Sequence, residues 1–329
     1  MIFIKYPVNY LSNICPKNSE DKVQTILGAS GVIGTELAKA LTQYTNKIRL
    51  VSRNPKRVNS NDQLVIADLT NAQQVLSAVE GSEIVYLTVG IQYKISEWQK
   101  NWPVIMKNVI DACKMNKSKL VFFDNVYAYG LVKGWMKEDT LINPVSKKGE
   151  VRAQIAQMIM SEVEKGHIDA IIARAPDFYG PNTPLSFATV TVFHNLKKGK
   201  KAQWFIDANK KHSMIYTPDA AKATAILGNT NFAYNQIWHL PTDKNALTGK
   251  EFINIAAKEF GVRPDYITLK KWMIQMIGAF VPVVKESIEM LYQNEYDYLF
   301  DSTKFENAFN FVPTSYKDGI AATVKSMRS

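Results

Sequence analysis

The chain contains little cysteine and little histidine. Its 329 residues include two cysteines, Cys15 and Cys113, and four histidines that are scattered along the sequence. Two cysteines cannot form a disulfide framework, which favours a reducing compartment, and we therefore expect a cytoplasmic protein. Cysteine and histidine residues do not occur together at the spacing of metal ligands, so the sequence predicts no metal site.

Long hydrophobic runs are also lacking. The longest apolar window, residues 272–284, contains Gln275 and Pro282 and is too short to cross a bilayer. We interpret it as a buried helix or a surface that faces a partner, and we expect no membrane partner. The start of the chain has no substantial basic region, long apolar core or small-residue cleavage site, unlike a signal peptide. We interpret residues 1–22 as an N-terminal extension, either disordered or due to a misplaced start codon.

Positive charge exceeds negative charge, and the formal net charge is +10. The positive residues are spread along the chain, and the densest group consists of Lys197, Lys198, Lys200 and Lys201. We interpret this group as a solvated surface and expect no nucleic-acid partner. An anionic ligand is a further alternative for these lysines.

The most informative segment is residues 23–38, which read VQTILGASGVIGTELA. An apolar run, three glycines and an apolar-periodic segment predict a strand, a tight turn and a helix. Gly28 permits the turn, Gly31 lets the backbone approach a ligand, and Gly34 lets helix and strand pack closely. Such a turn directs backbone N–H groups and a helix N-terminus at one point, which suits a pyrophosphate.

We therefore predict a dinucleotide site at this loop. The predicted cofactor-binding residues are Gly28, Ser30, Gly31, Val32, Ile33 and Gly34. The spacing is G-x-x-G-x-x-G, whereas the commonest dinucleotide motif is G-x-G-x-x-G. A loop that merely turns is the alternative interpretation.

A second strand is predicted over residues 47–51, and it ends in Ser52 and Arg53. In a dinucleotide fold this strand end meets the adenosine ribose, where an acidic residue binds both hydroxyl groups and an arginine binds a 2′-phosphate. No acidic residue occurs between Glu36 and Asp62. Since a guanidinium is permanently charged and grips phosphate with two N–H groups, we predict NADP(H) rather than NAD(H). Ser52 would add a hydroxyl donor; an ordinary solvated loop is the alternative.

Strand and helix signals alternate through the first half of the chain. Further strands are predicted at residues 64–67, 83–89, 119–123 and 168–173, and helices at residues 72–79, 97–115 and 151–165. This alternation predicts an α/β protein with a Rossmann-type, doubly wound parallel sheet. Ligands of such sheets gather at the carboxyl ends of the strands. Six residues fall there and are interpreted as one site: Gly28, Arg53, Asp68, Gly90, Asn125 and Arg174.

The pattern changes beyond residue 179, where prolines become frequent and helices shorter. This change predicts a smaller C-terminal α/β lobe that covers the nucleotide site. We place the dinucleotide-binding domain at residues 23–180, with residues 212–240 returning to it, and the substrate lobe mainly at residues 181–329.

Six segments carry a more specific signal than the glycines alone. They are GASGVIG at 28–34, ADLT at 67–70, LTVG at 87–90, VFFDNVYAYG at 121–130, ARAPDFYGP at 173–181 and HSMIYTPDAAKA at 212–223. In this order and spacing they resemble the extended short-chain dehydrogenases, the NAD(P)-dependent epimerase/dehydratase family. The resemblance runs from residue 23 to the C-terminal region.

The resemblance implies further coenzyme contacts at the strand ends. They are Asp68 and Leu69 at the adenine, Thr88, Val89 and Gly90 at the nicotinamide ribose, and Pro176, Asp177 and Phe178 at the nicotinamide. For Asp68 a turn or helix-capping role is the alternative, because Leu69-Thr70-Asn71 could begin a helix. The family also implies a dimer through the helices at 97–115 and 151–165.

The chain departs from the family at the catalytic positions. Family members carry a serine or threonine four residues before the Tyr-Gly pair, where Asn125 stands here. They also carry Tyr-x-x-x-Lys about 25 residues later. This chain has no tyrosine between Tyr129 and Tyr179, and its best alignment places Lys148 and Arg152 at the two positions.

These replacements change the available acid/base chemistry. In the family the tyrosine is the general acid/base and the lysine holds the nicotinamide ribose. Arg152 could grip the ribose but cannot transfer a proton, because arginine does not deprotonate in proteins. Asn125 can donate a hydrogen bond to a carbonyl or alkoxide, and Lys148 can act as acid/base if burial and Arg152 lower its pKa. The alternatives are that Lys148 is an exposed helix lysine, or that the proton is carried by Tyr127, Tyr129 or Tyr179.

Two functions remain open at this point. The first is an NADP(H)-preferring oxidoreductase, epimerase or dehydratase that acts on a carbonyl or nucleotide-sugar-like substrate with an atypical acid/base set. The second is a catalytically silent NADP(H)-binding sensor or regulator, suggested by the missing tyrosine. A nucleic-acid-associated protein is a weaker third interpretation. The aromatic residues of the second lobe, which include Trp204 and Phe193, indicate either a hydrophobic substrate site or, more commonly, a core.

Overall fold

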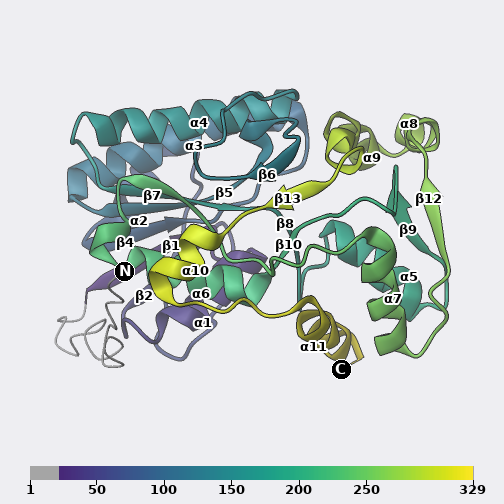
Figure 1. The fold of residues 1–329 in the computed structure, drawn as a ribbon. Coiled ribbons are helices and arrows are strands. Elements are labelled where there is room, and N and C mark those ends of the chain that lie inside the picture. Colours follow the sequence, from purple (N-terminus) through teal and green to yellow (C-terminus); the bar gives the residue numbers. More distant parts are fainter. Residues whose placement is uncertain (1–21, 329) are drawn as a thin grey trace, which may run out of the picture.

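The computed structural model describes residues 22–328, so the predicted N-terminal extension lies outside the described residues except for Lys22. Within this part of the chain, seven parallel strands form one sheet in the order β11-β7-β5-β4-β1-β2-β3 (Figure 1). The strands are β1 (Val23–Leu27), β2 (Ile48–Ser52), β3 (Gln63–Ile66), β4 (Ser82–Leu87), β5 (Lys119–Asn125), β7 (Ala170–Ala175) and β11 (Gln236–His239). The predicted Rossmann-type doubly wound sheet is confirmed.

Helices cover both faces of this sheet, as the doubly wound arrangement requires (Figure 1). One face carries α2 (Ala72–Val79), α3 (Ile95–Asn116) and α4 (Lys147–Glu164), and the other carries α1 (Val32–Leu41) and α6 (Thr217–Gly228). Each layer has its own core. Trp102 and Phe122 are buried in the first, and Leu37 and Tyr86 in the second. The central strands are therefore apolar along most of their length.

Two elements of this domain come from the second half of the chain. Helix α6 packs against α1, and strand β11 pairs with β7, with Gln236 opposite Ile171. Helix α4 begins four residues before the predicted start at residue 151, because the Ser146 side chain accepts a hydrogen bond from the Gly149 N–H and caps the helix.

The second lobe is built from short strands and helices. Three two-stranded pairs are β6 (Gly134–Met136) with β13 (Tyr298–Phe300), β8 (Asp177–Tyr179) with β10 (Met214–Tyr216), and β9 (Ala202–Phe205) with β12 (Tyr266–Leu269). The longer helices are α7 (Gly249–Phe260), α8 (Lys271–Phe280) and α11 (Tyr316–Arg328). Its shorter helical segments are η3 (Thr189–Phe193), α5 (His194–Lys197), α9 (Pro282–Ser287) and η5 (Ile288–Asn294). Three further short segments lie in the sheet domain, where η2 (Tyr127–Tyr129) packs against α4, η4 (Asn231–Ala233) against α6 and α10 (Thr303–Phe309) against β11.

Trp204, Phe193 and Phe252 lie in the core of this lobe, so these aromatic residues support the lobe itself. The pair β6–β13 joins the lobe to the loop that follows β5, since Trp135 of β6 pairs with Leu299 of β13. None of the helices within residues 22–328 is both long enough and apolar enough to span a bilayer.

Candidate active site at the carboxyl edge of the sheet

The loop between β1 and α1 has the geometry of a phosphate cradle. Gly28 has a φ of +96°, and a Cβ atom there would lie 2.4 Å from the Cα of Val89. A Cβ atom on Gly34 would lie 2.7 Å from the Gly28 carbonyl oxygen, so both glycines are required by close packing. A Cβ atom on Gly31 would approach only the Gly28 carbonyl oxygen, at 3.4 Å, and the Thr88 carbonyl oxygen, at 4.0 Å. The outer side of Gly31 is therefore open to a ligand.

The first turn of α1 presents its N–H groups without a side-chain cap. Its N-cap is Gly31, no side chain accepts a hydrogen bond there, and the first turn has no acidic residue. The starts of two neighbouring helices differ, because Asn71 caps α2 and Ser146 caps α4. Unpaired N–H groups and the helix dipole favour an anion, so the residues present at α1 fit the diphosphate of a dinucleotide.

The end of β2 lies beside this loop. The Ser30 hydroxyl donates to the Asn54 carbonyl oxygen at 2.8 Å and lies 2.7 Å from the Ser52 hydroxyl. Because the Ser30 proton goes to Asn54, the Ser52 hydroxyl donates its own proton to Ser30. The Ser52 oxygen also accepts from the Asn54 N–H at 3.1 Å. Arg53 is exposed and has no hydrogen bond or ion pair to any residue in the described range. Its guanidinium is the group at this strand end that can receive a phosphate.

The predicted adenine contacts follow β3. Asp68 is exposed, and one of its carboxylate oxygens accepts from the Thr70 N–H at 2.9 Å and from the Thr70 hydroxyl at 2.8 Å. These hydrogen bonds lower the pKa of Asp68 below its usual value, so the group is ionised at neutral pH. Asp68 forms a turn while Asn71 is the helix cap, and Leu69 is buried beneath it.

Asn125 and Tyr127 lie where β5 ends. The Asn125 side-chain oxygen accepts from the Tyr127 N–H at 3.0 Å, which leaves the Asn125 amide NH2 group as a donor. The Tyr127 ring is half-buried and stacks on Trp98, with ring centroids 6.3 Å apart. Burial raises the pKa of Tyr127 well above its usual value, and nearby Tyr93 and Asp177 raise it further.

The other two candidate tyrosines lie elsewhere. The Tyr129 hydroxyl is 2.8 Å from Nε2 of His239 and is buried. Tyr179 packs against Phe252 and Tyr316 in the second-lobe core. Of the three tyrosines named from the sequence, the structure brings Tyr127 to the groups around Asp177.

Lys148 is fully buried and ion-paired, so the sequence alternative of an exposed helix lysine is wrong. Its Nζ donates to Oε2 of Glu286 and Oε1 of Glu289, both at 2.8 Å, and to the Glu286 carbonyl oxygen at 2.9 Å. It also lies 4.6 Å from the Tyr93 ring centroid. All three ammonium protons have acceptors, which makes Lys148 an anchor for the second lobe.

Glu286 and Glu289 were not found from the sequence, because no local pattern marks them. Glu286 also accepts from the Ile95 N–H at 2.9 Å, and Glu289 from the Lys147 N–H at 2.8 Å. These N–H groups begin α3 and α4, the helices that follow β4 and β5, so they lie at the carboxyl edge of the sheet. We call Lys148, Glu286 and Glu289 the interlobe latch.

Arg152 lies deeper, behind β5. Its guanidinium carbon is 4.3 Å from the Trp102 ring centroid and 4.9 Å from that of Trp98, and its Nη1 is 3.4 Å from Oδ1 of Asp124. Asp124 also accepts from Nε of Arg174 at 3.2 Å. One buried carboxylate therefore balances two buried guanidinium groups. Burial lowers the pKa of Arg152, and the charge of Asp124 and the phenol of Tyr127 oppose that shift.

Asp177 joins the two lobes from β8. Its carboxylate lies 3.0 Å from Nε2 of His212, whose ring stacks on Tyr298 with centroids 4.5 Å apart. Four tyrosines gather around this carboxylate: Tyr93, Tyr127, Tyr292 and Tyr298. Burial raises the pKa of each hydroxyl, and the charge of Asp177 raises it further. Pro176 and Phe178 flank Asp177 in the chain, and Phe178 is half-buried.

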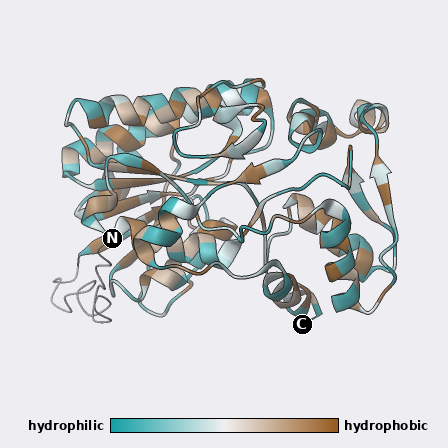
Figure 2. Ribbon diagram, in the orientation of Figure 1, coloured by the Kyte–Doolittle hydropathy of each residue, from teal (hydrophilic) through white to brown (hydrophobic). Residues whose placement is uncertain are grey.

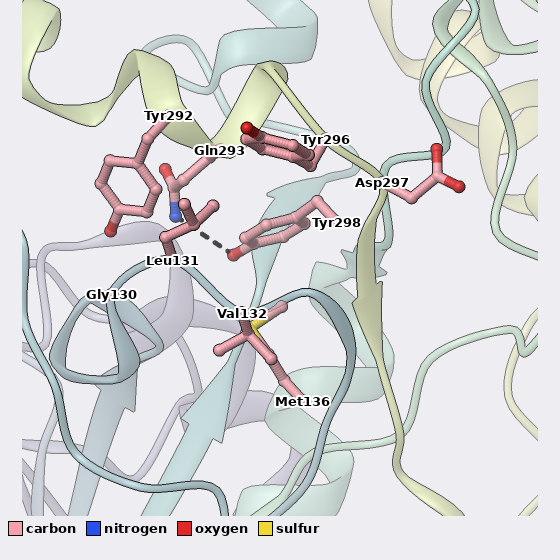
Figure 3. Close-up of a pocket in the computed structure, with 9 residues that line it drawn as sticks. All are labelled: Gly130, Leu131, Val132, Met136, Tyr292, Gln293, Tyr296, Asp297 and Tyr298. Atoms are coloured by element: carbon pink, nitrogen blue, oxygen red, sulfur yellow. Dashed lines mark hydrogen bonds between the residues drawn. The ribbon is translucent and has the colours of Figure 1, made fainter.

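A small cavity lies where the loop after β5 meets the segment before β13 (Figure 3). Tyr292, Gln293 and Tyr298 line one side of it, and Gln293 donates to the Tyr298 hydroxyl at 3.5 Å. Its volume is about 10 Å³, enough for roughly one water molecule. This cavity is part of the joint between the lobes and is too small for a substrate.

The fold and the phosphate cradle at the carboxyl edge of the sheet are those of the extended short-chain dehydrogenases. The NAD dependent epimerase/dehydratase family model matches residues 25–237, about two thirds of the chain. The chain belongs to this family.

Similar proteins agree with this assignment. The Bacillus subtilis protein YtcB, described as an uncharacterized UDP-glucose epimerase, is 25% identical over 232 residues, which cover 66% of this chain and 69% of YtcB. The crystal structure of UDP-glucuronic acid 4-epimerase from Bacillus cereus in complex with NAD has a TM-score of 0.75 at 19% identity, over 93% of this chain and 98% of that one. UDP-glucose 4-epimerase from Thermus thermophilus, also with NAD, has a TM-score of 0.75 at 17% identity, over 93% and 99%. At these identities the structures show a shared fold.

Proposed function

We propose that this chain binds NADP(H) across the carboxyl edge of the sheet. The observation that carries the proposal is the exposed Arg53 guanidinium at the end of β2, beside the uncapped start of α1. The open face of Gly31 would receive the diphosphate, Asp68 the adenine amino group, and Thr88 to Gly90 the nicotinamide ribose. The structural relatives that contain NAD support a nicotinamide dinucleotide. Arg53 supports the 2′-phosphate form, because the chain has no acidic residue at the end of β2, between Glu36 and Asp62, to bind the ribose hydroxyls.

We further propose hydride transfer at a carbon that bears a carbonyl or hydroxyl group, on a small molecule such as a nucleotide sugar. On a carbonyl substrate the nicotinamide would supply the hydride and the chain the proton; on a hydroxyl substrate the oxidised nicotinamide would accept the hydride and the chain would take up the proton. In both cases the chain must supply the polarising groups. Asn125 offers an amide donor for the substrate oxygen. We take the Tyr127 hydroxyl, which is hydrogen-bonded to Tyr93 and has the positive charge of Arg152 nearby, as the proton donor. The Nζ of Lys148 is paired with two carboxylates, and this pairing serves to position the second lobe.

Arg53→Asp tests the coenzyme assignment. We expect the NADPH dissociation constant to rise about 10- to 100-fold, since a charge-assisted phosphate contact is replaced by repulsion. The NADH constant should stay the same or fall. Fluorescence titration with both coenzymes measures this. Lys56→Asp is the matched control, because Lys56 is also exposed in this loop and its substitution makes the same change in net charge. An unchanged ratio of the two constants in Arg53→Asp would refute the role of Arg53.

Tyr127→Phe tests the proton donor. The variant keeps the ring that stacks on Trp98 and removes only the hydroxyl. We expect NADPH affinity to stay within about twofold and NADPH oxidation across a panel of carbonyl compounds to fall about 100-fold or more, the usual range for loss of a general acid. Tyr266→Phe, at a half-buried tyrosine in the second lobe, is the control. Undiminished turnover in Tyr127→Phe would remove Tyr127 from the mechanism.

A second candidate is a catalytically silent NADP(H)-binding protein. One observation favours it: the groups at the family's catalytic tyrosine and lysine positions are both engaged inside the protein, Lys148 by two glutamates and Arg152 by Asp124 and two tryptophans. Wild-type protein that binds NADPH tightly and transfers no hydride to any member of the carbonyl panel would support this candidate over the first.

A further inference from the structure

Helix α8 has a buried side and an outer side that carries large apolar residues in contact with solvent. Trp272, Met276 and Phe280 have exposed fractions of 61%, 60% and 87%. Because they are four residues apart, they form one stripe along the helix. The buried side holds Ile274, which packs in a small cluster with residues of β12 and η5. The window predicted to be buried or to face a partner therefore has one buried and one open side.

Helix α9 packs closely against α8 and extends its apolar surface. A Cβ atom on Gly278 would lie 3.1 Å from the Cα of Lys285, so the two helices form one tight hairpin. Ile277, Val281 and Val283 of this hairpin are also exposed, and with the stripe they form what we call the α8–α9 face (Figure 2). At ordinary side-chain areas, roughly 150–250 Å² for an aromatic residue, this face presents on the order of 700 Å². Monomeric proteins rarely expose a contiguous apolar patch larger than about 300–600 Å², and larger patches mark sites for a protein partner or a membrane.

Lysines bracket the α8–α9 face. Lys270 and Lys271 come directly before the stripe, Lys285 follows the exposed valines, and all three residues are exposed. Residues 266–285 contain no acidic residue. The formal net charge of the whole chain, +10, has the same sign. An anionic surface would therefore attract both the chain and this face of it.

Neighbouring carboxylates leave this charge largely uncompensated. Glu286, the next residue after Lys285, is held in the interlobe latch. Glu295 lies 3.2 Å from Lys271, but both side chains reach solvent, where such an ion pair contributes little. In the part of the chain that the structure describes, Lys270 and Lys285 have no carboxylate partner. Their charges can therefore interact with an external anion.

A lipid surface accounts for this combination better than a protein partner does. Lysine is depleted in protein–protein interfaces. Helices that lie in a membrane interface combine lysine residues with an apolar face that contains tryptophan and phenylalanine. Helix α8 has 10 residues and is too short to cross a bilayer, so it would lie in the plane of the interface. The hairpin lies at the outer edge of the second lobe, where a flat surface can reach it (Figure 1).

We propose that the α8–α9 face docks this chain on an anionic lipid bilayer, with the stripe among the acyl chains and the lysines at the headgroups. The proposal does not depend on the coenzyme. It departs from the expectation of no membrane partner, which depended on the lack of a spanning segment, because a helix in the interface needs none. Docking also reaches the candidate site. Helix α9 carries Glu286 and leads into Glu289, so a bound bilayer would brace the segment that holds the interlobe latch.

Vesicle flotation with the full-length protein tests the proposal. We expect vesicles of equal parts phosphatidylcholine and phosphatidylglycerol to bind about 10-fold or more tightly than phosphatidylcholine alone, and added salt to weaken this binding. In Trp272→Ser/Phe280→Ser the affinity for the anionic vesicles should fall about 10- to 100-fold, because two apolar side chains no longer insert. The control is Leu185→Ser/Val312→Ser, which changes two exposed apolar side chains outside this face and should bind like wild type.

A second pair of variants separates the lysines of this face from the charge of the whole chain. Lys270→Gln/Lys271→Gln/Lys285→Gln should weaken binding to the anionic vesicles about 10- to 100-fold. Lys198→Gln/Lys200→Gln/Lys201→Gln makes the same change in net charge at another group of exposed lysines. It should weaken binding less than about threefold, because charges away from the docked face are screened by salt. Far-ultraviolet circular dichroism confirms that each variant is folded.

A fluorescent label locates the contact. Cys113 is buried, so in a Cys15→Ser background a nitrobenzoxadiazole label attaches to Met276→Cys or to Val312→Cys. The label on Met276→Cys should brighten and shift to the blue when anionic vesicles are added, and the label on Val312→Cys should not.

Three results would overturn the proposal. They are a wild-type protein that does not bind anionic vesicles, binding that Trp272→Ser/Phe280→Ser leaves unchanged, and equal losses in the two triple lysine variants. The first result, together with self-association that Trp272→Ser/Phe280→Ser abolishes, would assign the face to a second copy of the chain instead.

Discussion

Lys148→Met is expected to reduce the free energy of unfolding by about 3–5 kcal/mol, the cost of removing one partner from a buried ion pair. Lys148 has no exposed surface, and its ammonium is held by two carboxylates and a carbonyl oxygen. Methionine fills a similar volume but leaves Glu286 and Glu289 charged with fewer donors. Urea unfolding measures the change. Hydrogen exchange should increase in residues 282–294, because the latch is their ion-paired connection to the start of α4.

Two controls separate this effect from a general loss of charge. Lys39→Met removes an exposed lysine paired with Glu36 at 2.7 Å and should cost less than about 0.5 kcal/mol. The triple variant Lys148→Met/Glu286→Gln/Glu289→Gln removes the unpaired charges and should regain a large part of the loss. A Lys148→Met protein as stable as wild type, with unchanged exchange in residues 282–294, would show that the latch does not hold the lobes together.

The ion pairs of the interlobe latch also make the stability of the folded state depend on pH. Burial acts to raise the pKa of Glu286, but hydrogen bonds from Lys148 and from the Ile95 N–H outweigh it and hold the pKa below the usual 4.5. A carboxylate with a lowered pKa stabilises the folded state fully at neutral pH, and this stabilisation is lost as the pH falls through the lowered value. Wild type and Lys148→Met should therefore converge in stability in acid.

Asp124→Asn is expected to have an effect of similar size, about 3–5 kcal/mol of unfolding free energy. Asp124 is buried and is the carboxylate that faces both Arg152 and Arg174. Asparagine keeps the shape and one hydrogen-bond acceptor but removes the charge, so two guanidinium groups remain buried without compensation. Since Asp124 precedes Asn125, coenzyme or substrate affinity should change together with stability.

The matched control for this substitution is Asp111→Asn. Asp111 pairs with Lys107 at 2.6 Å on the exposed side of α3, and its loss should cost less than about 0.5 kcal/mol. Equal urea midpoints for Asp124→Asn and Asp111→Asn would mean that the buried charge of Asp124 has little weight, contrary to the arrangement seen here.

Both predictions concern the two buried cations of α4, Lys148 and Arg152. The sequence alignment predicts Lys148 and Arg152 at the positions of the family's catalytic tyrosine and lysine, and in the structure both cations are enclosed by aromatic rings and carboxylates. Tyr93 lies under Lys148, and Trp98 and Trp102 lie against Arg152. Both side chains are therefore paired inside the protein, and the phenol of Tyr127, which is hydrogen-bonded to Tyr93, comes from the turn after β5.

Much of the fold was predictable, because its signals are local. The apolar strands, the glycine turn at residues 28–34 and the arginine after β2 depend on residues close together in sequence, and the alternation of strand and helix leaves few arrangements of the sheet. The absence of a tyrosine between Tyr129 and Tyr179 is also read directly from the sequence. The helix predicted at residues 72–79 has the observed bounds of α2. The helix predicted at residues 151–165 starts one turn later than α4, because the N-cap Ser146 lies outside the apolar pattern.

The surroundings of Lys148 and Arg152 were decided by tertiary structure. A sequence shows that Lys148 and Arg152 share one helix face, but it does not show what covers that face. Glu286 and Glu289, 138 and 141 residues further on, are brought there by the second lobe. The burial and ion pairing of a side chain depend on which distant segments of the chain pack against it, and its chemical behaviour depends on both. In this protein the glycine turn and the arginine after β2 can be read from neighbouring residues, whereas the burial and ion pairing of Lys148 and Arg152 depend on the folded whole.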